Sequence, residues 1–160
     1  MDIQRDILPL KNVMYRLALR ITLNSQEAED VVQDVIVKVW GMHDQMDAVT
    51  NLEAYIMRMT RNIALDRQKL KANNTESIEG IDFASENSIE KNIEKEERLQ
   101  SIRDVMSQLP EKQRTAMQLR DFEGRNYKEI AQVMDVTEDQ VKVYIFRARQ
   151  FVKTRLTSFN

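Results

Sequence analysis

Apolar side chains recur three and four residues apart through residues 7–71, and this spacing predicts a bundle of three helices. The first helix is expected from Ile7 to about Leu23, with Pro9 in its first turn, where proline is tolerated. The second follows a near capping box at residues 24–27, and the third starts at a T-x-x-E capping box at residues 50–53. The positions expected to be buried are Leu10, Val13, Met14, Leu17 and Ile21, then Ala28, Val31, Val32, Val35, Ile36 and Val39, then Leu52, Tyr55, Ile56, Met59 and Ile63.

Three more helices are predicted in the C-terminal part of the chain. One starts at residues 109–111 and stops before Gly124, Asn126 caps a short one over residues 127–134, and a T-x-x-Q capping box at residues 137–140 starts a long one. The tight turn between the last two, followed by a basic helix, is a helix-turn-helix pattern. The residues expected to pack inward are Ala116, Met117, Leu119, Phe122, Ile130, Ala131, Met134, Val136, Val141, Ile145 and Ala148.

Residues 72–86 separate the two groups of helices and are polar, without helical period, which is typical of a linker. The predicted fold class is therefore all-α, with two small helical domains joined by an acidic linker. The expected boundaries are 1–71, 72–97 and 98–160. Three Gly and two Pro leave little turn chemistry for a β-sandwich or barrel. The residues leave open whether the two domains pack together.

Composition excludes several kinds of chemistry. The chain has no Cys for a disulfide or thiolate, and its one histidine, His43, cannot form a His pair for a metal. His43 is expected at the surface or as a C-terminal helix cap. We therefore expect no metal, no cofactor and no enzymatic activity, since the acidic clusters on helix surfaces are usually just solvated. No stretch approaches 18 apolar residues and no signal segment opens the chain, which predicts no membrane insertion and a cytoplasmic location.

The charge distribution adds a functional clue that the total conceals. Lys and Arg number 24 against 26 Asp and Glu, a formal charge of −2. Resolved along the chain, residues 1–54, 55–71, 72–97, 98–139 and 140–160 carry −4, +4, −6, −1 and +5. One basic block lies on the third predicted helix and the other on the last. These blocks suit nucleic-acid phosphates, and the acidic face of the second helix suits a protein partner.

Three ordered motifs make the chain resemble a known family. Residues 28–40, AEDVVQDVIVKVW, resemble the polymerase-core-binding helix of bacterial sigma factors. Residues 52–56, LEAYI, with 61–66, RNIALD, resemble the promoter-melting helix that follows it. Residues 109–114, LPEKQR, with 127–131, YKEIA, and the VK and FRAR segments of 141–149 resemble the domain that reads the −35 promoter element. The short two-domain form looks like an extracytoplasmic-function (ECF) sigma factor.

The resemblance implies a sigma factor that binds core RNA polymerase and directs promoter recognition, DNA melting and transcription initiation. An anti-sigma factor, membrane-anchored or soluble, is a further partner that the family often has. The residues implied in polymerase binding are Asp30, Gln33, Asp34, Lys38 and Trp40. Those implied at the −10 DNA are Asp47, Val49, Thr50, Asn51, Arg58, Arg61, Asn62, Asp66 and Arg67. Those implied at the −35 DNA are Asn126, Tyr127, Lys128, Thr137, Asp139, Gln140, Lys142, Val143, Phe146, Arg147 and Arg149.

The chain departs from the family pattern at two places. Val35 and Ile36 stand where an aromatic residue is usual, which alters the packing of the second helix. Val143 and Tyr144 stand where many members are more polar, so Tyr144 is interpreted as a core residue instead of a base contact.

Two other classes remain as alternatives. A stand-alone helix-turn-helix regulator would bind an operator without polymerase, but it leaves the acidic helix at residues 28–40 unexplained. A helical adapter or sequestering protein would bind proteins only, and its two basic blocks would be solvated faces.

Overall fold

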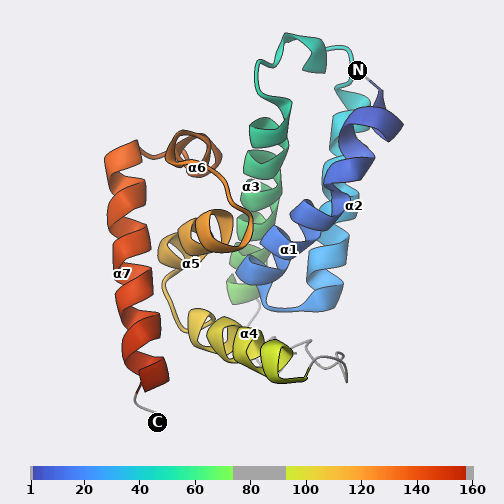
Figure 1. The fold of residues 1–160 in the computed structure, drawn as a ribbon. Coiled ribbons are helices and arrows are strands. Elements are labelled where there is room, and N and C mark those ends of the chain that lie inside the picture. The colour runs from blue at the N-terminus through green and yellow to red at the C-terminus, as the bar shows by residue number, and fades with distance from the viewer. Residues whose placement is uncertain (1, 74–92, 158–160) are drawn as a thin grey trace.

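The computed structural model describes residues 2–73 and 93–157, and every regular element in these two stretches is a helix (Figure 1). The all-α prediction is confirmed. The N-terminal lobe, residues 2–73, contains a π-helical turn Ile3–Ile7, a 3₁₀ turn Leu8–Leu10, α1 Lys11–Thr22, α2 Ser25–Gly41, a 3₁₀ turn Met46–Ala48 and α3 Leu52–Asn73. The C-terminal lobe, residues 93–157, contains α4 Ile93–Met106, α5 Glu111–Met117, a π-helical turn Gln118–Phe122, α6 Tyr127–Met134 and α7 Glu138–Thr157.

Capping side chains fix where several helices begin. The side chain of Asn24 accepts a hydrogen bond from the Glu27 amide (2.9 Å) at the start of α2, and Asn126 accepts one from Glu129 (2.8 Å) at the start of α6. The capping box before α7 is reciprocal: the Gln140 amide donates to Thr137 Oγ1 at 3.1 Å and the Thr137 amide donates to Gln140 Oε1 at 2.9 Å. These predicted starts are confirmed.

Three predicted boundaries differ from the structure. The cap of α3 is Asn51, whose side chain accepts from the Ala54 amide (3.1 Å), so the cap lies one residue after the Thr50 expected from the sequence. Helix α1 begins at Lys11 because Pro9 lies in the 3₁₀ turn Leu8–Leu10. Helix α4 begins at Ile93, inside the stretch assigned to the linker, and the earlier part of that linker, residues 74–92, lies outside the described residues.

The α1 and α2 helices bury the stripes predicted for them. In α2, Ala28, Val31, Val32, Val35 and Val39 are buried and Ile36 is half-buried against them. Because four valines are mediocre helix formers, packing against α1 and α3 is what holds this helix.

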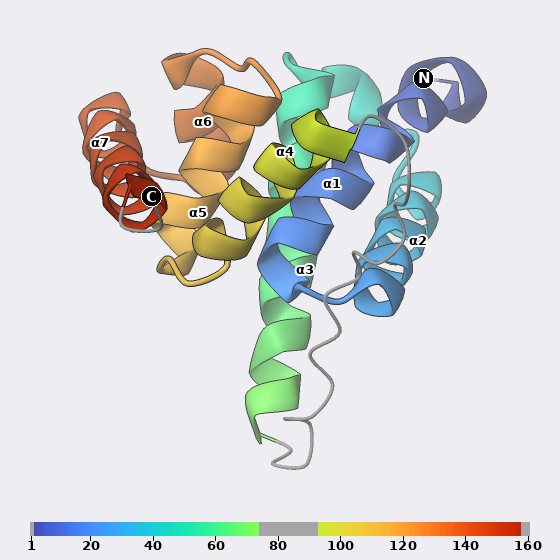
Figure 2. The same ribbon diagram turned by 60° about the horizontal axis from the view of Figure 1, so that its bottom comes forward.

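Helix α3 is buried on two faces, whereas the sequence predicted one. Ile56 and Met59 are buried as expected, and Leu52, Tyr55 and Ile63 are half-buried. On the other side Met57, Thr60, Arg61 and Ala64 are also buried, since α6 of the C-terminal lobe packs against α3. Figures 1 and 2 both place α1 and α3 between α2 on one side and α5, α6 and α7 on the other.

The two lobes consequently share one hydrophobic core. Its buried members from the C-terminal lobe include Leu119, Ile130, Met134 and Ile145, in the same cluster as Met14, Leu17, Val31 and Ile56 of the N-terminal lobe. A smaller cluster, containing Met106 and Leu109, joins α4 to α5 and α7. Lobes of about 70 residues are marginal alone, so the shared core contributes stability that neither would have by itself.

Arg114 of α5 ties the C-terminal lobe to the end of α1. Its guanidinium donates to the carbonyl oxygens of Arg20 at 2.5 Å and Ile21 at 3.3 Å, and to that of Leu109 at 3.2 Å. The last carbonyls of a helix have no partner within the helix, so Arg114 supplies donors that α1 lacks. Burial lowers the pKa of Arg114 from its ordinary value.

Arg20, beside it, is a half-buried cation in a cationic neighbourhood. The pKa of Arg20 is lowered to about 10, chiefly by burial and then by the positive charges of Arg103 and Arg114. Tyr15 and Asp104 raise this pKa and only partly offset the lowering. The folded state thus disfavours the charged form of Arg20, and at neutral pH that penalty is fully present because the group stays protonated.

Replacing Arg20 with methionine is therefore expected to stabilise the protein. The substitution removes a poorly compensated cation, while the methionine side chain keeps the aliphatic packing. The free energy of unfolding should therefore rise by about 1 to 3 kcal/mol at pH 7. Urea denaturation followed by circular dichroism measures this change. A variant less stable than the wild type would show that the Arg20 charge contributes a favourable interaction.

Candidate polymerase and nucleic-acid interfaces

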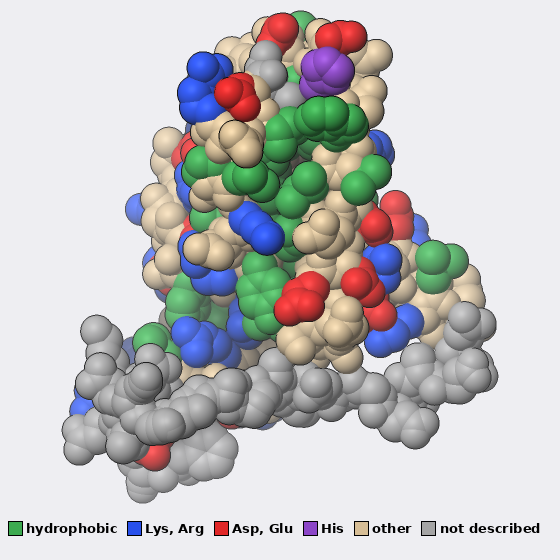
Figure 3. Space-filling view, turned by 90° about the vertical axis from the view of Figure 1, so that its right-hand side faces the viewer, with side chains coloured by type: hydrophobic (Ala, Val, Ile, Leu, Met, Phe, Trp, Pro, Cys, Tyr) green, Lys and Arg blue, Asp and Glu red, His purple; other side chains and the backbone are tan. Residues whose placement is uncertain are grey.

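The outer face of α2 carries the residues expected to bind polymerase. Gln33, Asp34, Lys38 and Trp40 are exposed and Asp30 is half-buried, so the structure brings these five onto one accessible face. Val37 and Trp40 are 68% and 63% exposed, so α2 presents two large apolar side chains to solvent. Figure 3 views this side of the molecule, where hydrophobic side chains gather next to acidic ones. Such a mixed face suits a protein partner.

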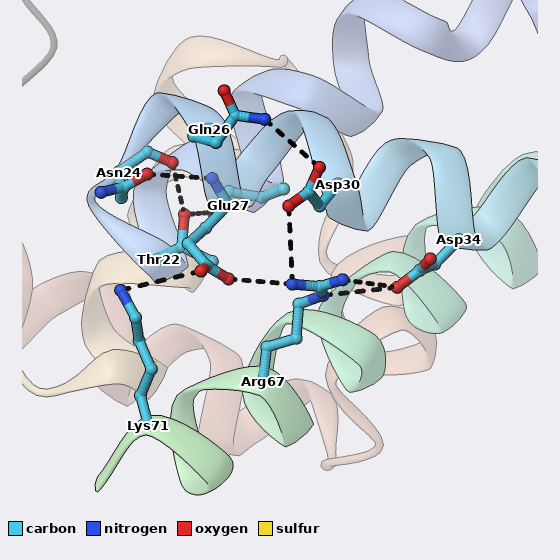
Figure 4. A network of polar contacts seen from close by, with 9 residues as sticks. Thr22, Asn24, Gln26, Glu27, Asp30, Asp34, Arg67 and Lys71 are labelled. Atoms are coloured by element: carbon cyan, nitrogen blue, oxygen red, sulfur yellow. Dashed lines mark hydrogen bonds and ion pairs between the residues drawn. The ribbon is translucent and has the colours of Figure 1, made fainter. Parts of the chain in front are cut away.

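An ion-pair network joins this face to α3 (Figure 4). Arg67 Nη1 lies 3.1 Å from Glu27 Oε1 and 3.8 Å from Asp30 Oδ2, and Arg67 Nη2 lies 3.1 Å from Asp34 Oδ2. Lys71 Nζ lies 3.7 Å from Glu27 Oε2. Burial alone would lower the pKa of Arg67, but the hydrogen bonds that Arg67 donates to Asp34 and Glu27 raise it overall. Arg67, predicted at the −10 DNA, is therefore held on the acidic side chains of α2.

The loop before α3 presents part of the expected −10 surface. Met46 is buried and anchors the loop, while Asp47 and Thr50 are exposed and Val49 is half-buried. Asn51 uses its side chain to cap α3. His43, just past the end of α2, places Nδ1 2.9 Å from the Trp40 carbonyl oxygen, which matches its predicted role as a C-terminal cap.

The expected −10 residues of α3 divide between two surroundings. Asn62 and Asp66 are exposed and line a hollow together with Leu65, Gln68, Lys69 and Ala72. Arg58 and Arg61 instead face the C-terminal lobe: Arg58 Nη2 lies 3.3 Å from Asp135 Oδ2, and Arg61 is only 6% exposed. The sequence prediction had grouped all four on one surface.

The helix-turn-helix is built by α6 and α7. Between them Asp135 adopts a left-handed conformation (φ 58°), which short polar residues tolerate, and it ends α6 sharply. Tyr127, expected at the −35 DNA, is half-buried with the Arg120 guanidinium 4.8 Å and Lys142 Nζ 5.8 Å from its ring centre. Asn126, Lys128 and Asp139 are exposed.

One face of α7 is buried and the opposite face is exposed. Val141, Ile145 and Ala148 are buried, as predicted, and Tyr144 is half-buried against the core, which agrees with its interpretation as a packing residue. The exposed face carries Lys142, Val143, Phe146 and Arg147, with Phe146 62% exposed. Arg149 bonds to Asp121 of the preceding turn, so the structure does not present it freely with the others.

Sequence reasoning missed the residues that hold the two lobes together. Glu111 was predicted only as part of a helix start and motif, and Glu123 and Arg125 were not singled out, yet each of the three pairs with a side chain of the N-terminal lobe. No local signal identifies them, because each partner lies at least 50 residues away along the chain.

Two helical lobes, one of them a helix-turn-helix with a basic outer helix, define a DNA-binding protein of all-α class. Family models of sigma-70 factors match both lobes: "Sigma-70 region 2" covers residues 7–73 and "Sigma-70, region 4" covers residues 99–152. The RNA polymerase sigma-H factor of Pseudomonas aeruginosa is 29% identical over 94% of this chain and 85% of its own length. The ECF RNA polymerase sigma factor SigM of Bacillus subtilis is 28% identical over 89% of this chain and 87% of its own.

Solved structures agree on the fold. The sigma factor RpoE of Bartonella quintana, in complex with the anti-sigma factor NepR, has a TM-score of 0.77 with 21% identity, over 98% of this chain and 97% of that one. CnrH, in complex with the cytosolic domain of CnrY, has a TM-score of 0.72 with 18% identity, over 99% of this chain and 89% of that one.

The chain belongs to the sigma-70 family of RNA polymerase sigma factors and is of the ECF type. It is a promoter-recognition factor, and the stand-alone regulator is not favoured. Sigma-70 factors as a family are not enzymes. In the described part of the chain, no helix is both long enough and apolar enough to cross a membrane.

Proposed function

We propose that the outer face of α2 binds core RNA polymerase, that the α3 face around Asn62 with the preceding loop holds the −10 strand, and that α7 enters the −35 major groove. The observation that carries this assignment is the two-sided character of α7. Its inner side chains are buried in the core, while Lys142 and Arg147 are exposed for phosphates and Val143 and Phe146 for base edges or a thymine methyl group.

At the −10 element, the hollow beside Asn62 and Asp66 offers a polar, accessible surface on α3. Extrusion of a base costs a few kcal/mol, which contacts with such a surface offset. Asp47 and Thr50 of the loop before α3 are also exposed, and we propose that they contact the same strand. This supports DNA melting by the N-terminal lobe.

The partners follow from this assignment: core RNA polymerase, promoter DNA and an anti-sigma factor. The apolar surface at Val37 and Trp40 and that at Val143 and Phe146 are the described faces that suit a protein partner. We infer that the protein acts in the cytoplasm, where core polymerase works.

Run-off transcription with core polymerase across a promoter library tests the proposal. The protein should create start sites that core polymerase alone lacks. Complete absence of a stimulated start site would show that the function is wrong.

Replacing Arg147 with alanine is expected to remove about one phosphate contact, because Arg147 lies on the exposed face of α7. The slope of the logarithm of the DNA-binding constant against the logarithm of salt concentration should then decrease by about one unit. Fluorescence anisotropy of the polymerase-bound factor on promoter DNA measures this slope, and an unchanged slope would place Arg147 away from the backbone. Glu138→Gln, at the start of the same helix, removes no cation and serves as a control.

A further inference from the structure

Three acidic side chains lie in one row along α2. Glu27, Asp30 and Asp34 are three and four residues apart, so they share a face of the helix. Like charges at this spacing repel one another and destabilise a helix. Asp34, at the end of the row, is one of the residues on the outer face of α2. A cation from another element is therefore needed to hold these carboxylates together in a fixed arrangement.

Arg67 of α3 supplies that cation. Figure 4 shows its guanidinium reaching α2 between Glu27 and Asp34. Nε and Nη2 both donate to Asp34 Oδ2, at 3.3 and 3.1 Å, and Nη1 donates to Glu27 Oε1 at 3.1 Å. Asp30 is held from two sides, because Oδ2 lies 3.8 Å from Nη1 and Oδ1 accepts from Gln26 at 3.4 Å. The planar fork of an arginine fixes two carboxylates in one geometry, which the point charge of a lysine does not do.

The geometry leaves one oxygen of Asp34 for another molecule. Both hydrogen bonds from Arg67 go to Oδ2, and no donor among the described residues bonds to Oδ1. The Asp34 side chain is 49% exposed. Because a carboxylate accepts hydrogen bonds on both oxygens, a cationic donor of a partner can bind Oδ1 while Arg67 keeps Oδ2. Binding of a partner at Asp34 is therefore compatible with the Arg67 pair.

The surroundings of Arg67 do not suit a DNA phosphate. The network contains three carboxylates and two cations, Arg67 and Lys71, which leaves a net charge of −1. Phosphates bind where positive charge is in excess. Arg67 is also not among the residues that line the hollow beside Asn62, where the −10 strand is proposed to lie. The charge and the position of Arg67 both favour a role on α2.

We propose that Arg67 is a positioning residue for polymerase binding: its guanidinium holds the Asp34 carboxylate by one oxygen and presents the other to a cationic donor of core polymerase. This role replaces the −10 contact that the family resemblance implies for Arg67. The proposal rests on the polymerase role of α2 given under Proposed function. Without Arg67, polymerase itself would have to order the Asp34 side chain, and ordering one such side chain costs about fivefold in affinity.

Arg67→Lys tests this role, because it keeps the positive charge and loses the fork. Titration of labelled core polymerase should show binding about fivefold weaker than that of the wild type. In the Asp34→Asn background, which lacks the carboxylate that Arg67 positions, the same change should weaken binding less than about twofold further. Arg98→Lys makes the same substitution at an exposed position of α4, and it should bind as the wild type does.

Arg67→Met tests the DNA side of the proposal. With the factor saturated by polymerase, the salt dependence of promoter binding should have the same slope as in the wild type, since no phosphate contact is lost. Arg147→Ala, whose slope is expected to decrease in the same assay, shows that the measurement can detect one lost contact. Circular dichroism should show unchanged helical content in the variants at position 67, because partly exposed ion pairs contribute little to stability.

Three results would overturn the proposal. They are wild-type or tighter polymerase binding by Arg67→Lys, an equal loss with and without the Asp34 carboxylate, and a slope about one unit smaller in Arg67→Met. An equal loss would show that position 67 acts through the general structure of the lobe. If the wild type neither binds polymerase nor stimulates run-off transcription, the proposed function fails. If it does both while Arg67→Lys binds normally, only the positioning role fails.

Discussion

Replacing Arg114 with methionine is expected to lower the free energy of unfolding by about 3 kcal/mol. The change removes the charged donor that binds three carbonyl oxygens, two of them at the end of α1. Hydrogen bonds to charged groups contribute about 1.5 to 3 kcal/mol each, and rearrangement of the surrounding structure reduces the total loss. The loss exceeds the gain from removing a cation whose pKa is already lowered by burial. Urea denaturation at pH 7 measures the difference.

Arg20→Met provides the matched control, because it makes the same substitution at the neighbouring arginine with the opposite expected sign. Arg20 contributes its backbone carbonyl to the Arg114 contact, and that carbonyl is retained in the variant. If Arg114→Met proves as stable as the wild type, water must satisfy the carbonyls of α1 without Arg114.

Charge reversal at Asp34 is expected to weaken binding to core polymerase about 100-fold. Asp34 lies exposed on α2 and also accepts hydrogen bonds from Arg67, so Asp34→Arg both reverses the charge at the proposed contact and sets two cations against each other. Loss of close charge pairs at interfaces costs about 2 to 5 kcal/mol, and a 100-fold change in the dissociation constant corresponds to about 2.8 kcal/mol, within that range. Titration of labelled core polymerase with each variant measures the dissociation constant.

Two comparisons separate the effects at Asp34. Asp34→Asn removes the pairing with Arg67 without reversing the charge, and it should weaken polymerase binding less than about tenfold. Asp44→Arg makes the same reversal at a side chain 93% exposed beyond the end of α2, and it should bind as the wild type does. Normal polymerase binding by Asp34→Arg would remove this residue from the interface.

The sequence predicted the helices well because their signals are local. Apolar spacing located the buried stripe of α2, and the reciprocal box of Thr137 and Gln140 located the start of α7. The start of α1 was four residues late relative to the prediction, because a proline-containing 3₁₀ turn continues the same apolar period without being α-helix.

The second buried face of α3 could not be predicted in the same way. Thr60, Arg61 and Ala64 are not apolar enough to form a stripe, and their burial depends on α6, which lies far along the chain. A polar side chain can be buried when its partner is supplied, as Glu111 does for Arg61, but the sequence contains no mark that links the two. The roles of the DNA-facing residues likewise remain predictions, since their ligands are other molecules.

The shared core has a consequence for exchanging parts between sigma factors. A chimera that takes its C-terminal lobe from a relative, to change the −35 sequence it reads, also replaces the partners of Arg16, Arg61 and Glu53 and the C-terminal side of the hydrophobic contact. The chimera would need to keep the residues of this protein at positions 111, 123, 125, 130 and 134, because these contact the N-terminal lobe. Otherwise promoter specificity and solubility would change together. In this protein the helix-turn-helix can be exchanged for another only if the residues that pack against the N-terminal lobe are kept.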